Sequence, residues 1–114
     1  MKAMQIVSFD GPASGLRYQE ASTPEPGPGQ IAVDVDHAGV GYVEALFTEG
    51  LVPIDLPWTP GLEVSGRVRA LGDGVDGYRL GDAVVALTIT GGGGYGQVAV
   101  APAELVVPLP AGLD

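Results

Sequence analysis

Apolar and polar residues alternate along several short segments of the chain, and this period of two predicts β-strands. The segment that begins at Gln30 places four residues on one face and two aspartates on the other: Ile31, Val33, Val35 and His37 against Asp34 and Asp36. Residues 62–71 alternate in the same way, with Leu62, Val64, Val68 and Ala70 opposite Glu63, Ser65, Arg67 and Arg69. Gly66 interrupts this second apolar row, which indicates a bulge, a bend or a close backbone contact there.

Further strands are predicted over residues 2–8, 16–20, 83–87, 95–101 and 105–107, the second returning as the hairpin partner of the first. Residues 41–50 form the one segment with helical spacing. Val43, Leu46 and Phe47 share one face of such a helix, and Gly50 can cap its C-terminal end.

Glycine and proline are abundant, with 19 and 10 residues, yet 46% of the chain is hydrophobic. Short strands joined by tight turns reconcile the two figures better than disorder does. Residues 24–29 are too rich in proline and glycine to be anything but a loop, and residues 51–61 form an irregular loop that partly buries Trp58. The 114 residues suit one domain, predicted to be mostly β: a barrel of about seven strands with one short helix.

The charge balance narrows the range of partners. Five basic and 14 acidic residues give a formal charge of −9, which repels nucleic-acid phosphates and anionic membranes. No cysteine is present, so disulfides, thiolate nucleophiles and cysteine zinc sites are excluded. Neither a signal peptide nor an apolar run of the ~18–20 residues that span a membrane is found, and we expect a cytoplasmic protein without nucleic-acid or membrane partners.

Two glycine triplets match the dinucleotide fingerprint G-x-G-x-x-G, and both fail on context. Gly72–Gly77 leads into another turn rather than a helix, and its two aspartates would place negative charge beside a pyrophosphate. The second match, Gly91, Gly93 and Gly96, leads into a predicted strand. Flexible β-turns are the better interpretation of both.

Three side chains stand out as candidates for chemistry. His37 lacks the partners of a zinc site or a catalytic triad, so a hydrogen-bonded structural histidine is the better interpretation. Glu63 follows a Pro-Gly turn at a strand end, where a solvated carboxylate is favoured over a functional one. Tyr95 lies on a glycine loop that we expect to be mobile, and it suits either lining a pocket or capping the barrel.

The order of these segments resembles a known family. The stretches KAMQIVSFDGP, PEPGPGQIAVDVDHAGV, LPWTPGLEVSGRVRALGDGVDGYRLGDAVVAL, GGYGQVAV and VVPLPAGLD are similar to the N-terminal domain of medium-chain dehydrogenases/reductases. The P-G-x-E-x-x-G-x-V segment (residues 60–68) and the following G-D-x-V make the resemblance specific. The nearest branch is the zinc-independent, NADPH-dependent quinone oxidoreductases and enoyl reductases. The resemblance implies a GroES-like, partly open barrel over residues 1–114.

The same resemblance implies how a site would be built. The family holds NADPH mainly in a following Rossmann domain, which we expect to be absent from this chain and supplied in cis or in trans. Zinc is not expected, because Gly61-Leu62-Glu63 replaces the Gly-His-Glu of the zinc branch. The residues implied to line the substrate and cofactor are Gly41, Tyr42, Val52, Glu63 and Tyr95. Gly41 stands where relatives have asparagine and Val52 where they often have tyrosine, so no catalytic residue is assigned.

Two functions follow from the resemblance. The first is the substrate-side domain of an NADP(H)-dependent quinone-reductase-like enzyme, inactive alone, with a quinone or enone substrate. The alternative is a free-standing GroES-like binding or assembly module without catalysis. A barrel without its cofactor domain would expose an apolar cleft, so we expect a homo-oligomer that covers Tyr42, Phe47, Val52, Trp58 and Tyr95 or extends a sheet edge.

Overall fold

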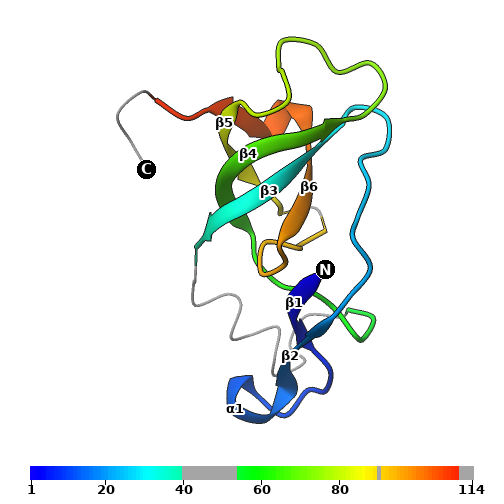
Figure 1. The fold of residues 1–114 in the computed structure, drawn as a ribbon. Helices are drawn as coiled ribbons and strands as arrows, with labels where there is room; N and C mark the ends of the chain where they lie inside the picture. The colour runs from blue at the N-terminus through cyan, green and yellow to red at the C-terminus, as the bar shows by residue number, and fades with distance from the viewer. Residues whose placement is uncertain (40–53, 90, 111–114) are drawn as a thin grey trace.

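The computed structural model describes residues 1–39, 54–89 and 91–110, in which nearly all regular structure is β (Figure 1). The elements in chain order are β1 (Lys2–Ile6), α1 (Pro12–Gly15), β2 (Leu16–Glu20), β3 (Gln30–Ala38), β4 (Glu63–Leu71), β5 (Ala83–Leu87), β6 (Val98–Pro102), the 3-10 turn η1 (Ala103–Leu105) and β7 (Val106–Pro108). The mostly β prediction is confirmed. The helix predicted over residues 41–50 lies outside the described residues, whereas the four-residue α1 was not predicted.

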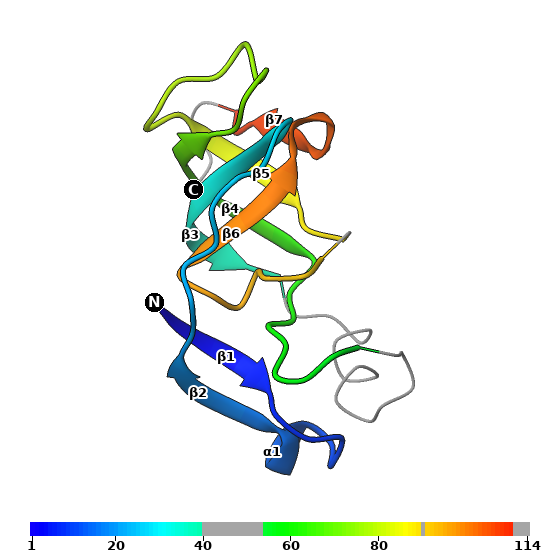
Figure 2. The same ribbon diagram turned by 90° about the vertical axis from the view of Figure 1, so that its right-hand side faces the viewer.

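Five strands form one antiparallel sheet in the order β6-β3-β4-β5-β7. The strands at its two edges, β6 and β7, are separated in sequence only by the three residues of η1. Because so short a connection brings the two edges together at one end, the sheet curls into a partly open barrel, as Figure 2 shows. A separate two-stranded sheet, β1-β2, lies below it and has the hairpin pairing that the sequence predicts.

The barrel interior is filled by small and β-branched side chains. Its buried cluster comprises Ile31, Val33, Val64, Val68, Val84, Ala86, Ala99, Ala101 and Val106. Val64 and Val68 of the predicted apolar row belong to this cluster, while the alternate side chains Glu63, Arg67 and Arg69 are exposed. At the end of β4 the prediction is wrong: Ala32 pairs with Ala70 and Val33 with Val68, so the register shifts at Arg69, and Leu71 packs against the cluster in place of Ala70.

The face predicted for β3 is correct only in part. Ile31 and Val33 are buried, but His37 is exposed, and no described residue hydrogen-bonds its ring. The register explains the difference: Val35 pairs with Gly66, yet His37 pairs with Ser65, so one extra residue bulges out of β3 at Asp36. Because a shift of one residue moves the following side chain to the other face of the strand, the bulge turns His37 outward.

The strand predicted over residues 95–101 is shorter than expected. Gly94 and Tyr95 form a turn, Gly96 makes an isolated bridge to Ala3, and β6 begins only at Val98. Gly96 therefore contacts β1 instead of extending β6.

Gly66 lies at a close contact between backbones, as the sequence indicates. A Cβ atom there would collide with the carbonyl oxygen of Asp34 on β3 and would lie 3.0 Å from Cγ1 of Val33. Since a backbone carbonyl inside a paired sheet has little room to move, only glycine fits.

The substitution Gly66→Ala should therefore destabilise the chain by about 3 kcal/mol, because β3 and β4 would have to separate. Denaturant unfolding followed by circular dichroism measures this. Gly91→Ala is the matched control, since no atom lies within 4 Å of its Cβ position, and a change within about 0.5 kcal/mol is expected. Equal effects of the two substitutions would contradict the proposed backbone contact.

Candidate functional site

One end of the five-stranded sheet gathers the candidate residues. Because β3, β4, β5 and β6 are antiparallel neighbours, the last residues of β3 and β5 meet the first residues of β4 and β6 there. The segments that leave this end are Gly39, the turn 59–62, Thr88 and the glycine loop 91–97. The β1-β2 hairpin lies beyond the same end (Figure 1).

The glycine loop is fastened to the 59–62 turn by three backbone hydrogen bonds. The amides of Gly93, Tyr95 and Gly94 donate to the carbonyl oxygens of Thr59, Pro60 and Gly61 at 2.8, 2.9 and 3.1 Å respectively. We call this arrangement the clamp. Each of the amides of residues 93–95 has a backbone partner, which argues against the mobility expected of this loop.

Glycine is required on both sides of the clamp. Gly61 has a φ of +109°, and a Cβ atom there would lie 2.6 Å from the Cα atom of Gly94. Gly94 is less tightly confined, since its own Cβ position lies 3.0 Å from the carbonyl carbon of Gly61. Gly94, inside the glycine run that resembles a phosphate-binding fingerprint, thus serves backbone packing against Gly61.

Glu63 is the first residue of β4, directly after the clamp, and its side chain is exposed. The Gly39 amide donates to the Glu63 carbonyl oxygen at 3.1 Å, and a Cβ atom at Gly39 would collide with the Glu63 carboxylate. The absence of a side chain at Gly39 therefore leaves room for the carboxylate. Both residues border a hollow of about 280 Å³, whose wall includes His37 and Val85.

Tyr95 is half-buried and is held through its backbone on two sides. Its amide belongs to the clamp, and its carbonyl oxygen accepts a hydrogen bond of 3.1 Å from the amide of Met4 on β1. Glu63 and Tyr95 thus lie at the same end of the sheet, joined by the 60–62 turn. The other predicted site residues, Gly41, Tyr42 and Val52, lie outside the described residues, and their roles stay predictions.

Thr88 belongs to this end of the sheet and was not predicted. Its side chain is 1% exposed, and its hydroxyl donates to the Gly61 carbonyl oxygen at 2.6 Å. Its backbone amide donates to the carbonyl oxygen of Leu62 at 2.8 Å. The one signal in the sequence is a polar residue placed directly after the apolar strand 83–87.

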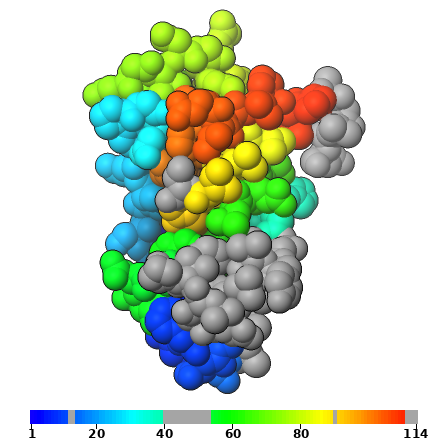
Figure 3. All heavy atoms as spheres, turned by 180° about the vertical axis from the view of Figure 1, so that it is seen from behind, coloured from blue at the N-terminus to red at the C-terminus, as the bar shows by residue number. Residues whose placement is uncertain are grey.

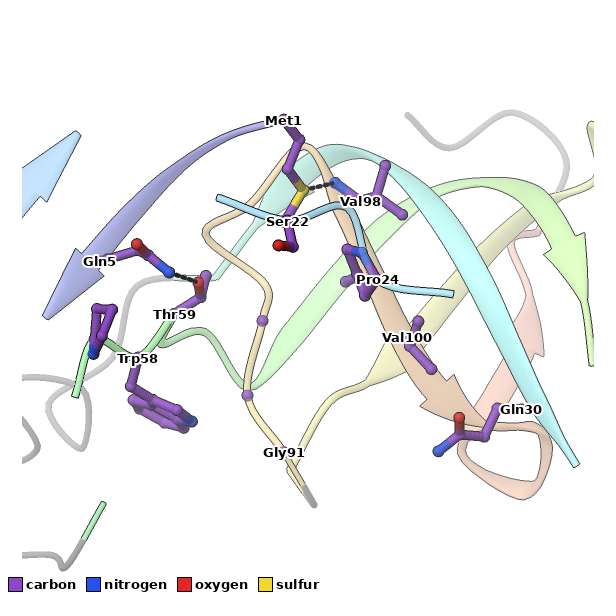
Figure 4. A pocket seen from close by; sticks show the side chains of 14 residues that line it. Met1, Gln5, Ser22, Pro24, Gln30, Trp58, Thr59, Gly91, Val98 and Val100 are labelled. Atoms are coloured by element: carbon purple, nitrogen blue, oxygen red, sulfur yellow. Dashed lines mark hydrogen bonds between the residues drawn. The ribbon is translucent and has the colours of Figure 1, made fainter. Parts of the chain in front are cut away.

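A larger hollow of about 540 Å³ lies on the far side of the glycine loop, between β1, the connection 22–30 and β6 (Figure 4). At one side of this hollow, the Gln5 side-chain amide donates to the Thr59 hydroxyl at 3.1 Å. Gly92 lies against the Trp58 ring, and a Cβ atom there would collide with ring atom Cζ2. Trp58 is half-buried, as predicted, while the homo-oligomer expected to cover it stays a prediction.

The described residues do not fit the phosphates of a dinucleotide. In the Gly72–Gly77 match, Asp73 and Asp76 are exposed, and a further turn follows, closed by the hydrogen bond of 3.1 Å from the Asp82 amide to the Arg79 carbonyl oxygen. Phosphate binding by this fingerprint needs a helix N-terminus at that point. The second match forms the clamp.

No cluster of three or more His, Cys, Asp or Glu side chains that could hold a metal ion occurs among the described residues. In residues 1–39, 54–89 and 91–110, no helix has the length and apolar character needed to cross a bilayer.

Comparison with known proteins gives this geometry a family context. The rat quinone oxidoreductase is 33% identical over 116 residues, covering 100% of this chain and 35% of that protein. The crystal structure of the human synaptic vesicle membrane protein VAT-1 homolog-like protein superposes with a TM-score of 0.94 at 32% identity, covering all of this chain and 36% of that one. A mycobacterial protein solved in complex with NADPH superposes with a TM-score of 0.88 at 31% identity, over all of this chain and 35% of that one.

The chain thus spans about a third of the length of each of these relatives. The family model for the alcohol dehydrogenase GroES-like domain matches residues 27–111, which include β3 to β7 and the clamp. This chain therefore belongs to the family of alcohol dehydrogenase GroES-like domains, the N-terminal domains of medium-chain dehydrogenases/reductases.

Proposed function

We propose that this chain is the substrate-side domain of an NADP(H)-dependent, quinone-reductase-like oxidoreductase. The observation that carries the proposal is that the whole chain aligns with the rat quinone oxidoreductase at 33% identity. The mycobacterial relative, part of which superposes on the whole of this chain, was solved in complex with NADPH, and this supports the choice of cofactor. A quinone or enone is the substrate class that these relatives suggest.

The described end of the sheet suits such a role. When bound, the cofactor supplies the hydride, so the protein has to supply orientation and exclusion of water rather than a nucleophile. The clamp holds the backbone shortly before Glu63 and at Tyr95, and Gly39 leaves space in front of the Glu63 carboxylate. We propose that these residues contribute to the wall of a substrate site.

The cofactor has to be bound outside the described residues, because neither glycine triplet fits a pyrophosphate. The relatives are about three times as long as the stretch that matches, which supports a dinucleotide-binding domain in the same polypeptide. We propose this domain as the partner, in cis or as a second chain. We also propose that zinc is not used, since Leu62 and Glu63 replace the His-Glu of the zinc branch and the chain has no cysteine.

A chimera tests the proposal. In the rat quinone oxidoreductase, the aligned segment would be replaced by this chain, and NADPH oxidation would be measured with a series of quinones. We expect quinone-dependent oxidation within about 100-fold of the rat enzyme, the loss that a small misplacement at a domain junction causes.

Two controls make the outcome readable. Binding of NADPH, followed by fluorescence, shows that the rat cofactor domain has folded, and slow hydrogen exchange at the Gly94 and Tyr95 amides shows that the grafted segment has folded as well. Gly61→Ala in the same chimera should abolish most turnover by opening the clamp. A chimera that binds NADPH yet reduces no quinone would contradict the proposal and favour the binding module without catalysis.

The chain alone should bind NADPH more weakly than about 1 mM, because it carries a formal charge of −9 and no described phosphate site. Isothermal titration calorimetry with the cofactor at millimolar concentration should give no saturable heat. A micromolar dissociation constant would show that a phosphate site has been missed.

A further inference from the structure

We propose that Thr88 is a positioning residue of the candidate site, whose buried hydroxyl keeps the clamp closed and thereby holds Glu63 and Tyr95 in place. The effect of Thr88 on catalysis rests on the proposed function. The hydrogen bonds of Thr88 are independent of that function, and they can be tested in the chain alone.

Thr88 is a buried residue that bonds to both of the segments joined by the clamp, with its hydroxyl on the side of the 59–62 turn. Its hydroxyl and amide donate to Gly61 and Leu62, at 2.6 and 2.8 Å, on the side of the turn. Its carbonyl oxygen accepts a hydrogen bond of 2.8 Å from the Gly92 amide, on the side of the glycine loop. A single residue therefore joins the end of β5 to both segments.

The hydroxyl acts at the Gly61 carbonyl, one of the three carbonyls of the clamp. The Gly61 carbonyl oxygen accepts one hydrogen bond from Thr88 Oγ1, at 2.6 Å, and a second from the Gly94 amide, at 3.1 Å. Both lone pairs of this oxygen are therefore paired. Gly61, Gly94 and Thr88 are all buried. Without the hydroxyl, one lone pair would be desolvated and unpaired, which favours any movement that opens the turn to water.

Such a movement would reach the site directly. Glu63 follows Gly61 and Leu62 in the chain, and Tyr95 follows Gly94. A shift of Gly61 or of Gly94 therefore changes where the side chains of Glu63 and Tyr95 lie. The residue that fixes the carbonyl consequently fixes the separation of two site residues without touching a substrate itself.

A matched control separates this role from ordinary stabilisation. Tyr78 also donates its hydroxyl to a backbone carbonyl oxygen, that of Val106, at 2.8 Å, and it is partly buried. It belongs to the connection 72–82, which lies at the end of the molecule opposite the β1-β2 hairpin, as Figures 1 and 3 show. Tyr78→Phe thus removes the same kind of hydrogen bond far from the clamp.

In the chimeric enzyme, Thr88→Val should lower kcat about tenfold or more while changing KM by less than about threefold, because orientation is lost rather than binding. Thr88→Ser, which keeps the hydroxyl, should restore kcat, and Tyr78→Phe should leave it near the parent value. A decrease in kcat that serine does not restore would overturn the assignment.

Amide hydrogen exchange by NMR tests the contacts in the 114-residue chain, independently of any activity. Thr88→Val should speed exchange at Gly94 and Tyr95 by about five- to tenfold relative to Val68, an amide at the opposite end of the sheet that donates to Asp82 at 2.9 Å. Thr88→Ser and Tyr78→Phe should not change this ratio. An unchanged ratio in Thr88→Val, or an equal rise in Tyr78→Phe, would overturn the proposal.

If Thr88→Val does not fold, the proposal can be tested by a measurement on the unaltered chain. The Thr88 hydroxyl proton, buried and donating, should exchange with water slowly enough to be observed at low temperature. Exchange as fast as that of the exposed Ser22 hydroxyl would overturn the proposal.

Discussion

Four consecutive backbone carbonyls, those of residues 59–62, accept hydrogen bonds from the segment 88–95. A turn that is half-buried or buried along its length cannot leave such groups unpaired, so the two segments have to stay in register. Glycine at positions 61 and 94 permits the approach, because a side chain at either position would meet the other backbone. The starting point of β4, and with it the placement of Glu63, depends on this contact.

The residues next to the clamp also connect the barrel to the β1-β2 hairpin. The free edge of β1 bonds to Trp58 near its end, through Ile6, and to residues 95–97 near its beginning, through Lys2 and Met4. Trp58 directly precedes the 59–62 turn, and residues 95–97 form the last part of the glycine loop. The hairpin is therefore attached to residues that adjoin the clamp.

Much of the fold could be predicted from local patterns, and most of the site could not. Period-two alternation located β3 and β4, short apolar runs between turn residues located β5 and the β1-β2 hairpin, and the interrupted apolar row marked Gly66 as a bulge, a bend or a close contact. The bulge at Asp36, which turns His37 outward, depends on pairing with β4 and leaves no trace in the pattern of β3 itself. The clamp and the role of Thr88 depend likewise on contact between segments distant in sequence. Glu63 could be singled out from its turn, whereas the fixed backbone of Tyr95 could not.

The most direct test of this account is a measurement of scalar couplings across hydrogen bonds in the isotopically labelled chain. The account predicts couplings from the amide nitrogens of Gly93, Gly94 and Tyr95 to the carbonyl carbons of Thr59, Gly61 and Pro60, respectively. Such couplings require short, aligned and persistently populated bonds. Their absence, with these amides exchanging as fast as that of the exposed Gly74, would show that the glycine loop is free and would contradict the account.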